Sequence, residues 1–254
     1  VRLVGSEMCI RDSPLPLNRL FMKKYFFFWW LLFSLLITSG VASASPFPRN
    51  VTVEFSGPLK SSITLKFIQT GNRYQITSYI HTAIYRTRYE SRGLLSNSLI
   101  WSQRFSEYRG NHLSSYTTFN PTQGQIIYGK IKKRKIISLN GQSLDIAALP
   151  WQIAINPSWH LKKVQITNGR SVYLLNGKGR FIQSFAQPKN IKSKQGYIKA
   201  FLYDLSSLRN YKNPIQFAYA PAYSNIPIYM KYTLAGHDFE FIVSKIWING
   251  KKVF

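Results

Sequence analysis

Apolar and polar residues alternate along most of the chain from residue 50 onward. The run 51–55 places Val, Val and Phe at alternate positions with Thr and Glu between them, and the runs 63–67 and 74–80 repeat this pattern. Alternate side chains of a strand point to opposite faces of its sheet. The pattern is therefore typical of antiparallel strands with one buried and one wet face. Thr70-Gly71-Asn72, between the last two runs, predicts a hairpin turn.

The same period predicts most of the remaining strands. They are expected at 99–108, 113–119, 125–131, 135–139, 163–167, 171–175, 179–185, 197–202, 215–219, 228–234 and 239–247. Turn dipeptides such as Asn140-Gly141, Asn168-Gly169, Asn176-Gly177 and Asn249-Gly250 connect several of them. About a dozen short strands at regular spacing predict a mainly β protein, built as a curled antiparallel sheet or open half-barrel. The polar stretch 188–195 predicts an eight-residue loop.

One segment, Leu144–Leu161, is apolar without clean alternation. Pro150 interrupts it, and Asn156-Pro157 has the residue types of a helix N-cap and first turn. We interpret the segment as two short helices, before and after that point, that cover the concave face of the sheet. Its large side chains would either contact an apolar ligand or fill the core. The residues expected to make ligand contacts are Trp151, Ile153 and Trp159.

The first 44 residues read as targeting and upstream sequence rather than as part of the fold. Residues 1–21 resemble a translated sequencing-adaptor artefact, and we exclude them. Residues 22–44 have the basic start, thirteen-residue apolar run (25–37) and small-x-small end of a signal peptide. We expect cleavage after Ala44 and a periplasmic location, with a single β-rich domain at 45–254. The alternative is an uncleaved membrane anchor, but thirteen residues span about 20 Å as a helix, less than the roughly 30 Å bilayer core.

The chain is strongly basic. Its 254 residues hold 34 Lys and Arg against 9 Asp and Glu, a formal charge of +25. Five of the basic and two of the acidic residues precede residue 45, so residues 45–254 carry 29 and 7, or +22. The one cysteine also precedes residue 45. An intrachain disulfide is therefore excluded, and sites that need many carboxylates are poorly supplied.

The sequence offers little for catalysis. Asp238 and Glu240 share one face of a predicted strand. They could form an acid–base pair if one were desolvated, although a wet sheet face is the simpler interpretation. The four histidines are scattered, without the spacing of a zinc site, and no nucleophile or phosphate-loop motif occurs. We predict that the protein is not an enzyme and has no cofactor or metal.

Basic residues are the stronger signal. Five cations occur in six positions: Lys130, Lys132, Lys133, Arg134 and Lys135. Arg86, Arg88 and Arg92 interleave with tyrosines, a mixture that could bind nucleic acid. Export makes nucleic acid an improbable partner. Lipid headgroups, lipopolysaccharide or another anionic envelope component fit that compartment better, while a generally basic surface without a specific ligand is the alternative.

Three stretches resemble a family of exported Gram-negative proteins classed as a domain of unknown function. They are the strand 71–76, the Ser-x-Gly step at 89–93 with the strand 99–105 after it, and the closing segment 220–240. The resemblance implies a periplasmic β-rich body without an established activity. At the level of fold it is also similar to lipoprotein-carrier proteins, which hold acyl chains on a concave apolar face.

Two functions follow as expectations. The first is a non-enzymatic binder of an apolar or amphiphilic envelope component, held beneath the Leu144–Leu161 segment. The alternative is a structural or interaction module whose basic residues dock on an anionic envelope polymer, a membrane surface or a protein partner. An open apolar cavity beneath that segment would favour the first, and a filled interior the second.

Overall fold

The computed structural model describes residues 47–82, 86–159, 164–175, 187–204, 215–234 and 237–254. The chain divides into two units, residues 1–45 and 46–254, and every described residue belongs to the second. The expected artefact, signal peptide and cleavage site lie outside the described residues, as do the expected strand 179–185 and the turn at Asn176-Gly177.

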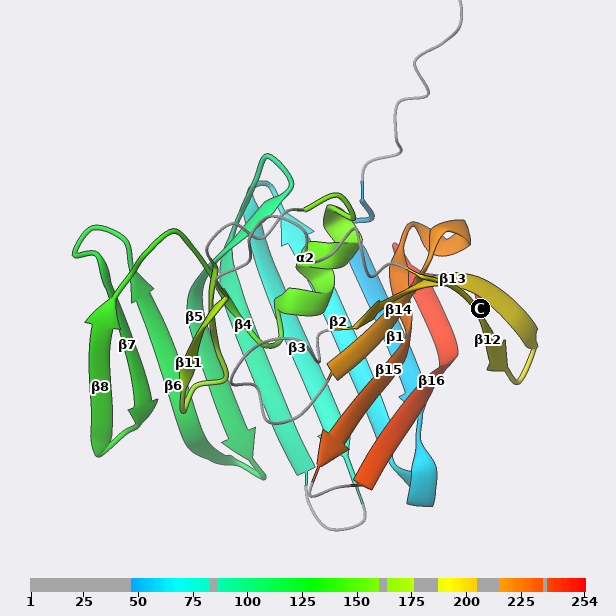
Figure 1. Ribbon diagram of the computed structural model, residues 1–254, viewed down its shortest axis with the longest axis horizontal. Coiled ribbons are helices and arrows are strands. Elements are labelled where there is room, and N and C mark those ends of the chain that lie inside the picture. The colour runs from blue at the N-terminus through cyan, green and yellow to red at the C-terminus, as the bar shows by residue number, and fades with distance from the viewer. Residues whose placement is uncertain (1–46, 83–85, 160–163, 176–186, 205–214, 235–236) are drawn as a thin grey trace, which may run out of the picture. The chain divides into compact units, whose positions relative to one another are not determined.

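One large antiparallel sheet forms most of the described fold (Figure 1). Its strands follow each other in the order β12-β13-β14-β15-β16-β1-β2-β3-β4-β5-β6-β7-β8, and β17 also pairs with β16. The bounds are β1 Asn50–Ser56, β2 Ser62–Thr70, β3 Arg73–His81, β4 Arg86–Ser96, β5 Leu99–Arg109, β6 His112–Asn120, β7 Gln125–Lys130, β8 Lys133–Ser138, β12 Gln187–Ser193, β13 Gly196–Asp204, β14 Ile215–Ala220, β15 Ile226–Leu234, β16 His237–Ile248 and β17 Lys251–Lys252. The sheet is curled but not closed, which confirms the predicted fold class.

Alternation produces this sheet as expected. In β1 the apolar Val51, Val53 and Phe55 are buried, while the polar residues between them are partly exposed. The predicted Asn249-Gly250 turn between β16 and β17 is also confirmed. Both residues have positive φ values, 50° and 83°, as a two-residue hairpin turn of this hand requires.

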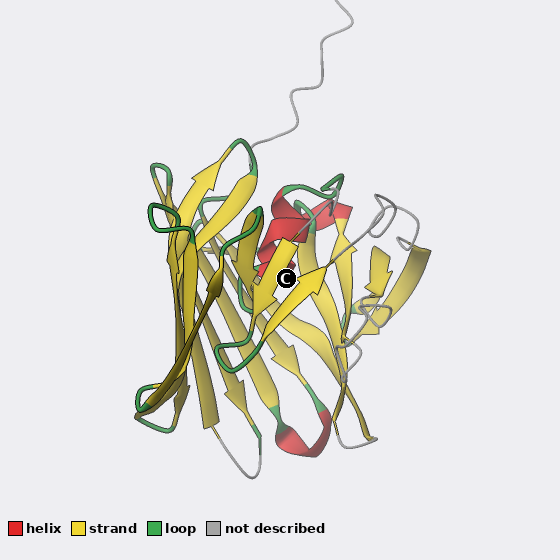
Figure 2. Cartoon of the chain, turned by 60° about the vertical axis from the view of Figure 1, so that its left-hand side comes forward, coloured by secondary structure: helices red, strands yellow, loops and turns green. Residues whose placement is uncertain are grey.

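A smaller unit lies on the concave face (Figure 2). It consists of the helix α2, Leu149–Ile155, and a three-stranded sheet of β9 Gln142–Asp145, β10 Val164–Thr167 and β11 Val172–Leu175. Strand β9 pairs with β10 in parallel, and β10 with β11 in antiparallel orientation. The helix contacts β5 on one flank and β15 on the other. We call this segment, 142–175, the inner unit.

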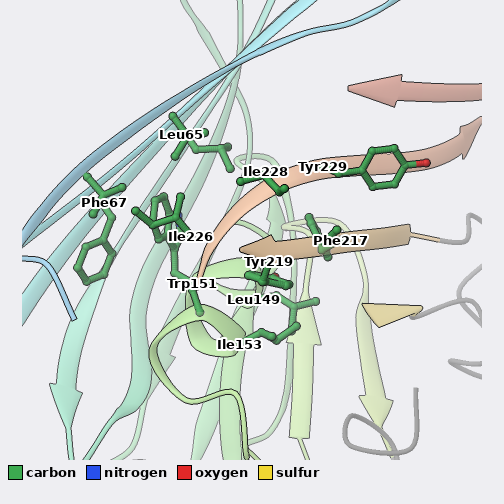
Figure 3. Close-up of a cluster of buried hydrophobic side chains, with 14 of the residues drawn as sticks. Leu65, Phe67, Leu149, Trp151, Ile153, Phe217, Tyr219, Ile226, Ile228 and Tyr229 are labelled. Atoms are coloured by element: carbon green, nitrogen blue, oxygen red, sulfur yellow. The ribbon is translucent and has the colours of Figure 1, made fainter. Parts of the chain in front are cut away.

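The main hydrophobic core lies between the helix and the sheet. The rings of Trp151 on α2 and Phe67 on β2 have centroids 5.2 Å apart, and Phe47 meets both edge-on. Figure 3 shows the helix side chains beside residues of three strands. The labelled members of this cluster are Leu65, Phe67, Leu149, Trp151, Ile153, Phe217, Tyr219, Ile226, Ile228 and Tyr229.

Strand β4 was not among the expected strands. Its inward positions include Thr87, Ser91 and Gly93, all buried, while Arg86, Arg88 and Arg92 occupy the opposite face. Inward polar and small residues hide the alternation on which the prediction depended. These small residues leave room for polar groups of the inner unit.

Two further expectations were wrong. Residues 188–195 are not a loop, because Gln187–Ser193 form strand β12. Pro188 is compatible with this strand since β12 lies at the edge of the sheet, where one side of the backbone needs no hydrogen-bonded neighbour.

Only the first expected helix of Leu144–Leu161 exists within the described residues. Pro150 does not interrupt it but lies in its first turn, where a missing N–H group costs no bond. Asn156 is the C-cap rather than the N-cap of a second helix, because its N–H group bonds to the carbonyl of Gln152. Residues 157–158 form a turn, and Leu144 belongs to strand β9.

Candidate functional site

The three expected apolar contacts are all buried. Trp151 and Ile153 lie on α2 with no exposed surface, and Trp159 follows the helix with 4 % exposed. Trp151 packs on Phe67. The indole N–H of Trp159 donates to Gln142 Oε1 at 2.8 Å. The placement of these side chains is that of core residues, and contact with a ligand stays a prediction.

Two glutamines, Gln152 on α2 and Gln142 on β9, attach the inner unit to the start of strand β5. Gln152, fully buried on α2, accepts a hydrogen bond from the backbone N–H of Ile100 at 2.6 Å and donates to the carbonyl of Ser98 at 3.0 Å. Gln142 donates to the carbonyl of Ile100 at 3.0 Å. The two side chains therefore satisfy backbone groups of Ser98 and Ile100, which fixes the position of the inner unit on the sheet.

Asp145 is the centre of a second buried network. Its Oδ1 accepts the N–H groups of Ala147 and Ala148 at 3.0 and 2.9 Å, just before the helix begins. Its Oδ2 accepts the hydroxyls of Ser91 on β4 and Ser102 on β5 at 2.5 and 2.8 Å. This carboxyl group has no exposed surface, so the network joins the inner unit to two strands of the sheet.

Burial dominates the electrostatics of this network. It raises the pKa of Asp145 to about 6, although four hydrogen bonds to the carboxylate oppose the rise. The hydroxyl of Tyr74 lies 3.1 and 3.0 Å from Ser91 Oγ and Ser102 Oγ. Burial and the nearby Asp145 carboxylate raise the pKa of Tyr74 well above its usual value. Because these groups are closed off from solvent, the arrangement serves to hold the inner unit in place.

An ion pair attaches the other end of the inner unit. Arg170, in the turn between β10 and β11, contacts both carboxylate oxygens of Glu107 on β5. Glu107 also accepts the Ser115 hydroxyl at 2.7 Å and lies 3.1 Å from Arg109 Nε. Burial would raise the pKa of Glu107, but these hydrogen bonds and the charge of Arg170 outweigh it and lower the pKa.

Two polar atoms in the core have no hydrogen-bond partner. They are the indole Nε1 of Trp151 and the hydroxyl of Tyr219, both completely buried. Trp151 lies on α2 and packs on Phe67, whereas Tyr219 lies on β14 and packs on Tyr203; Figure 3 labels both side chains in the same core cluster. Burying a polar group without a partner is costly, so each of these two atoms carries a desolvation penalty.

The five basic residues predicted to contact an anionic surface lie together at one end of the sheet. Lys130 ends β7 and Lys132 lies in the turn, while Lys133, Arg134 and Lys135 begin the edge strand β8. All five are exposed. Two apolar side chains accompany them, Ile131 with 64 % and Ile136 with 56 % of their surface exposed. We call residues 130–136 the basic hairpin.

Neutralising partners for the basic hairpin are absent from the described part of the chain, where no ion pair includes any of its five cations. Cations on an edge strand also discourage pairing with other chains. The two exposed isoleucines add apolar surface to the basic hairpin. The hairpin therefore presents positive charge and apolar side chains together.

Three cavities lie on the outer face of the sheet, which points away from α2, and at its rim. One of about 520 Å³ is bordered by Lys66, Tyr79 and Trp247, and one of about 710 Å³ lies near His81 and Gly110. A smaller one of about 170 Å³ lies over β4 and β5. None of these cavities is bordered by the residues of α2.

The expected acid pair has the geometry of a wet sheet face. Asp238 and Glu240 are about half exposed, and Lys231 lies between them at 2.7 and 3.6 Å. A salt-bridged, exposed pair lacks the desolvation that acid–base catalysis needs. Among the residues that the structure describes, no group of three His, Cys, Asp or Glu side chains could hold a metal ion. In the same residues, no helix is long and apolar enough to cross a membrane.

The sequence pattern missed the residues that organise the interior. Asp145, Gln152, Glu107 and Arg170 are isolated polar residues in the sequence, and the bonds that join them across the inner unit and the sheet span 43 to 63 positions. A usable signal existed only at Asp145, an acidic residue within an apolar segment.

Comparisons with known proteins give a fold likeness and no family. No family model matches the chain, and no curated protein matches it. Among solved structures, it is similar to a beta-barrel-like protein of a domain of unknown function, DUF1849, from Brucella abortus, with 6 % identity and a TM-score of 0.49. The match covers 81 % of this chain and all of that one.

Proposed function

We propose that this protein is an exported, non-enzymatic interaction module that docks on an anionic membrane surface of the cell envelope through its basic hairpin. The observation that carries the proposal is the composition of residues 130–136: four lysines, one arginine and two isoleucines, all exposed on an edge hairpin. The hydrogen bonds and the ion pair that attach the inner unit to the sheet also support the proposal, because a rigid sheet holds the basic hairpin in a fixed position.

The physical basis is electrostatic attraction combined with shallow apolar insertion. A cation near an anionic leaflet contributes about 1 kcal/mol, and the contribution falls off within a Debye length of about 8 Å at physiological salt. Five cations at one hairpin can therefore act together. Ile131 and Ile136 can add apolar burial at the headgroup boundary.

Vesicle binding tests the proposal. The purified protein is sedimented with phosphatidylglycerol–phosphatidylcholine vesicles over a range of salt concentrations. Replacing all five hairpin cations with glutamine should abolish binding and its salt dependence. The matched control replaces five exposed lysines elsewhere, namely Lys192, Lys194, Lys199, Lys251 and Lys252, and should retain most of the binding. Equal losses in both variants would mean that overall charge, not the hairpin, is responsible.

Export is a separate part of the proposal. Expression of the chain from Met22 in a Gram-negative host, followed by mass spectrometry of the periplasmic protein, should give a mature chain that begins at Ser45. A chain that still begins at Met22 would contradict cleavage after Ala44.

A second candidate function is the binding of an amphiphilic envelope component inside the curl. It is favoured by the unpartnered Trp151 Nε1 and Tyr219 hydroxyl, which a polar headgroup could satisfy. Native mass spectrometry of the protein purified from periplasm should then show a bound lipid, and Tyr219→Phe should reduce its occupancy. A spectrum of lipid-free protein would rule this function out.

A further inference from the structure

Two arginines face each other directly on the outer face of the sheet. Arg92 on β4 is the cross-strand partner of Arg104 on β5, and both side chains are exposed. Directly opposed residues have Cβ atoms about 5 Å apart, and like charges at such positions are destabilising. This pairing places two arginine side chains next to each other on one face of the sheet.

The carboxylate that borders the same cavity already has a partner. Glu90, two residues before Arg92, lies 3.2 Å from the Nε of Arg88. Arg88 in turn stacks on the ring of Tyr108, with its guanidinium carbon 4.4 Å from the ring centroid. Within the described residues, neither Arg92 nor Arg104 takes part in an ion pair.

A cavity lies over this pair. It measures about 170 Å³ and is bordered by Glu90, Arg92, Arg104, Ser106 and Tyr108. A water molecule occupies roughly 30 Å³ of liquid volume, so a single tetrahedral oxyanion fits. Ser106 and Tyr108 bring two hydroxyl groups to the border, which can donate hydrogen bonds to an anion.

Local backbone geometry holds the pair in place. The register of β4 and β5 shifts just after Arg92, so that Gly93 pairs with Ser102 and Gln103 is an extra residue. A Cβ atom on Gly93 would lie 2.0 Å from the carbonyl oxygen of Trp101. This close approach sets the strand positions beside Arg92, and such bulges often redirect side chains at functional sites.

We propose that Arg92 and Arg104 form a binding site for a phosphate monoester group. Each guanidinium group offers a planar fork of N–H donors that matches two oxygens of a phosphate. A dianionic phosphate neutralises both positive charges and relieves their repulsion, which a single carboxylate does only in part. The site is separate from the basic hairpin and does not depend on the proposed docking function.

Inorganic phosphate is the first probe. Its binding to ¹⁵N-labelled protein is followed by NMR titration, with chloride added to keep the ionic strength constant. One saturable site is expected, with shifts confined to residues near β4 and β5. Arg92→Gln or Arg104→Gln should weaken binding about ten-fold or more, because each removes charge-assisted hydrogen bonds. Lys199→Gln, which removes one exposed charge on β13, should leave the affinity unchanged within about two-fold.

A second measurement keeps the proposal testable if the variants differ in stability. Arg104→Lys retains the charge but lacks the fork, so its affinity should fall between those of the native protein and Arg104→Gln. Without phosphate, Arg92→Gln should unfold at the same or a higher temperature than the native protein, because a repulsion is removed. Equal phosphate affinity in the native protein and both glutamine variants would overturn the proposal, as would the absence of saturable binding.

The variant in which glutamine replaces the five hairpin cations shows whether the site binds a lipid headgroup or a free phosphate compound. If the site accepts a lipid headgroup, this variant should still bind phosphatidic acid vesicles, and glycerol 3-phosphate should displace it from them. If the site accepts only free phosphate compounds, glycerol 3-phosphate should bind in solution and the vesicles should not.

Discussion

Arg170 and Glu107 form a two-pronged ion pair, with Nε to Oε2 and Nη2 to Oε1 distances of 2.9 Å each. The carboxylate is nearly buried, whereas the guanidinium group is partly exposed and also donates to Ser114 Oγ at 2.9 Å. Gly169 brings the turn close to the sheet, because it has a positive φ of 82° and a Cβ atom there would lie 2.5 Å from Ser115 Oγ. The pair therefore ties the tip of the inner unit to β5.

Removal of Arg170 should destabilise the protein. Arg170→Ala leaves a nearly buried carboxylate with fewer partners, and we expect the free energy of unfolding in urea to fall by about 1–3 kcal/mol. Arg109→Ala is the control, since Arg109 contacts the same carboxylate but is 60 % exposed, and it should cost less than about 1 kcal/mol. The reverse order of the two losses would contradict the importance of Arg170.

The free energy of unfolding should depend on pH because the pKa of Asp145 is raised in the folded chain. The pKa of Asp145 is about 6 in the folded chain, above the usual aspartate value of 3.8, so the carboxyl group ionises at lower pH in the unfolded chain. Stability should fall between about pH 4 and pH 6 by roughly 3 kcal/mol and then stay level. Asp145→Asn should remove this slope. The lowered pKa of Glu107 acts in the opposite direction, because its contribution is lost as the pH falls below about 4.5.

A control separates charge from shape at the same position. Asp145→Asn keeps a side-chain acceptor for the Ala147 and Ala148 N–H groups, whereas Asp145→Leu removes it and leaves Tyr74 as the hydrogen-bond partner of the Ser91 and Ser102 hydroxyls. We expect the leucine variant to lose about 2 kcal/mol at pH 7, and the asparagine variant to be at least as stable as the native protein. A pH profile of Asp145→Asn that matches the native one would show that another group produces the slope.

Much of the sheet could be predicted from the sequence, because Val53, Phe67 and Ile76 mark its inner face by simple alternation. Strand β4 could not, since its inward Ser91 bonds to Asp145 and its inward Gly93 allows the close approach of Trp101 O, so neither position is apolar. The pairing of Arg92 with Arg104 also depends on a register shift that no periodicity reveals. Local patterns predict elements, whereas polar contacts between distant segments emerge only from the assembled sheet.

Tyr219→Phe should make the ligand-free protein more stable. The hydroxyl is buried without a partner, so its removal avoids a desolvation penalty and should raise the free energy of unfolding by about 1 kcal/mol. Thermal unfolding of refolded, lipid-free protein provides the measurement. Tyr203→Phe is a suitable comparison, because the two rings meet edge-on at 5.2 Å. A destabilised Tyr219→Phe variant would mean that the hydroxyl has a partner in solution.

Gly93→Ala should be poorly tolerated although the residue lies within a strand. The added Cβ would lie 2.0 Å from Trp101 O and 2.9 Å from Tyr74 Cε1, so β4 and β5 would have to separate. We expect a loss of about 2 kcal/mol or more, together with weaker phosphate binding at Arg92. Gly71→Ala, in a turn where nothing lies within 4 Å, is the comparison; its positive φ of 57° should cost only about 1 kcal/mol.

The position of β1 between β16 and β2 also governs how the chain reaches this fold. Ser244 Oγ on β16 donates to the carbonyl of Glu54 on β1, a contact that spans 190 positions of the sequence. Pairings of such long range are slow to form because a large loop must close first. The seven-residue helix is too short to be stable alone. Strand β1 can pair with β2 early, but its other edge must wait for β16, which lies near the end of the sequence. We therefore expect the pairing of β1 with β16 to be a late step of folding.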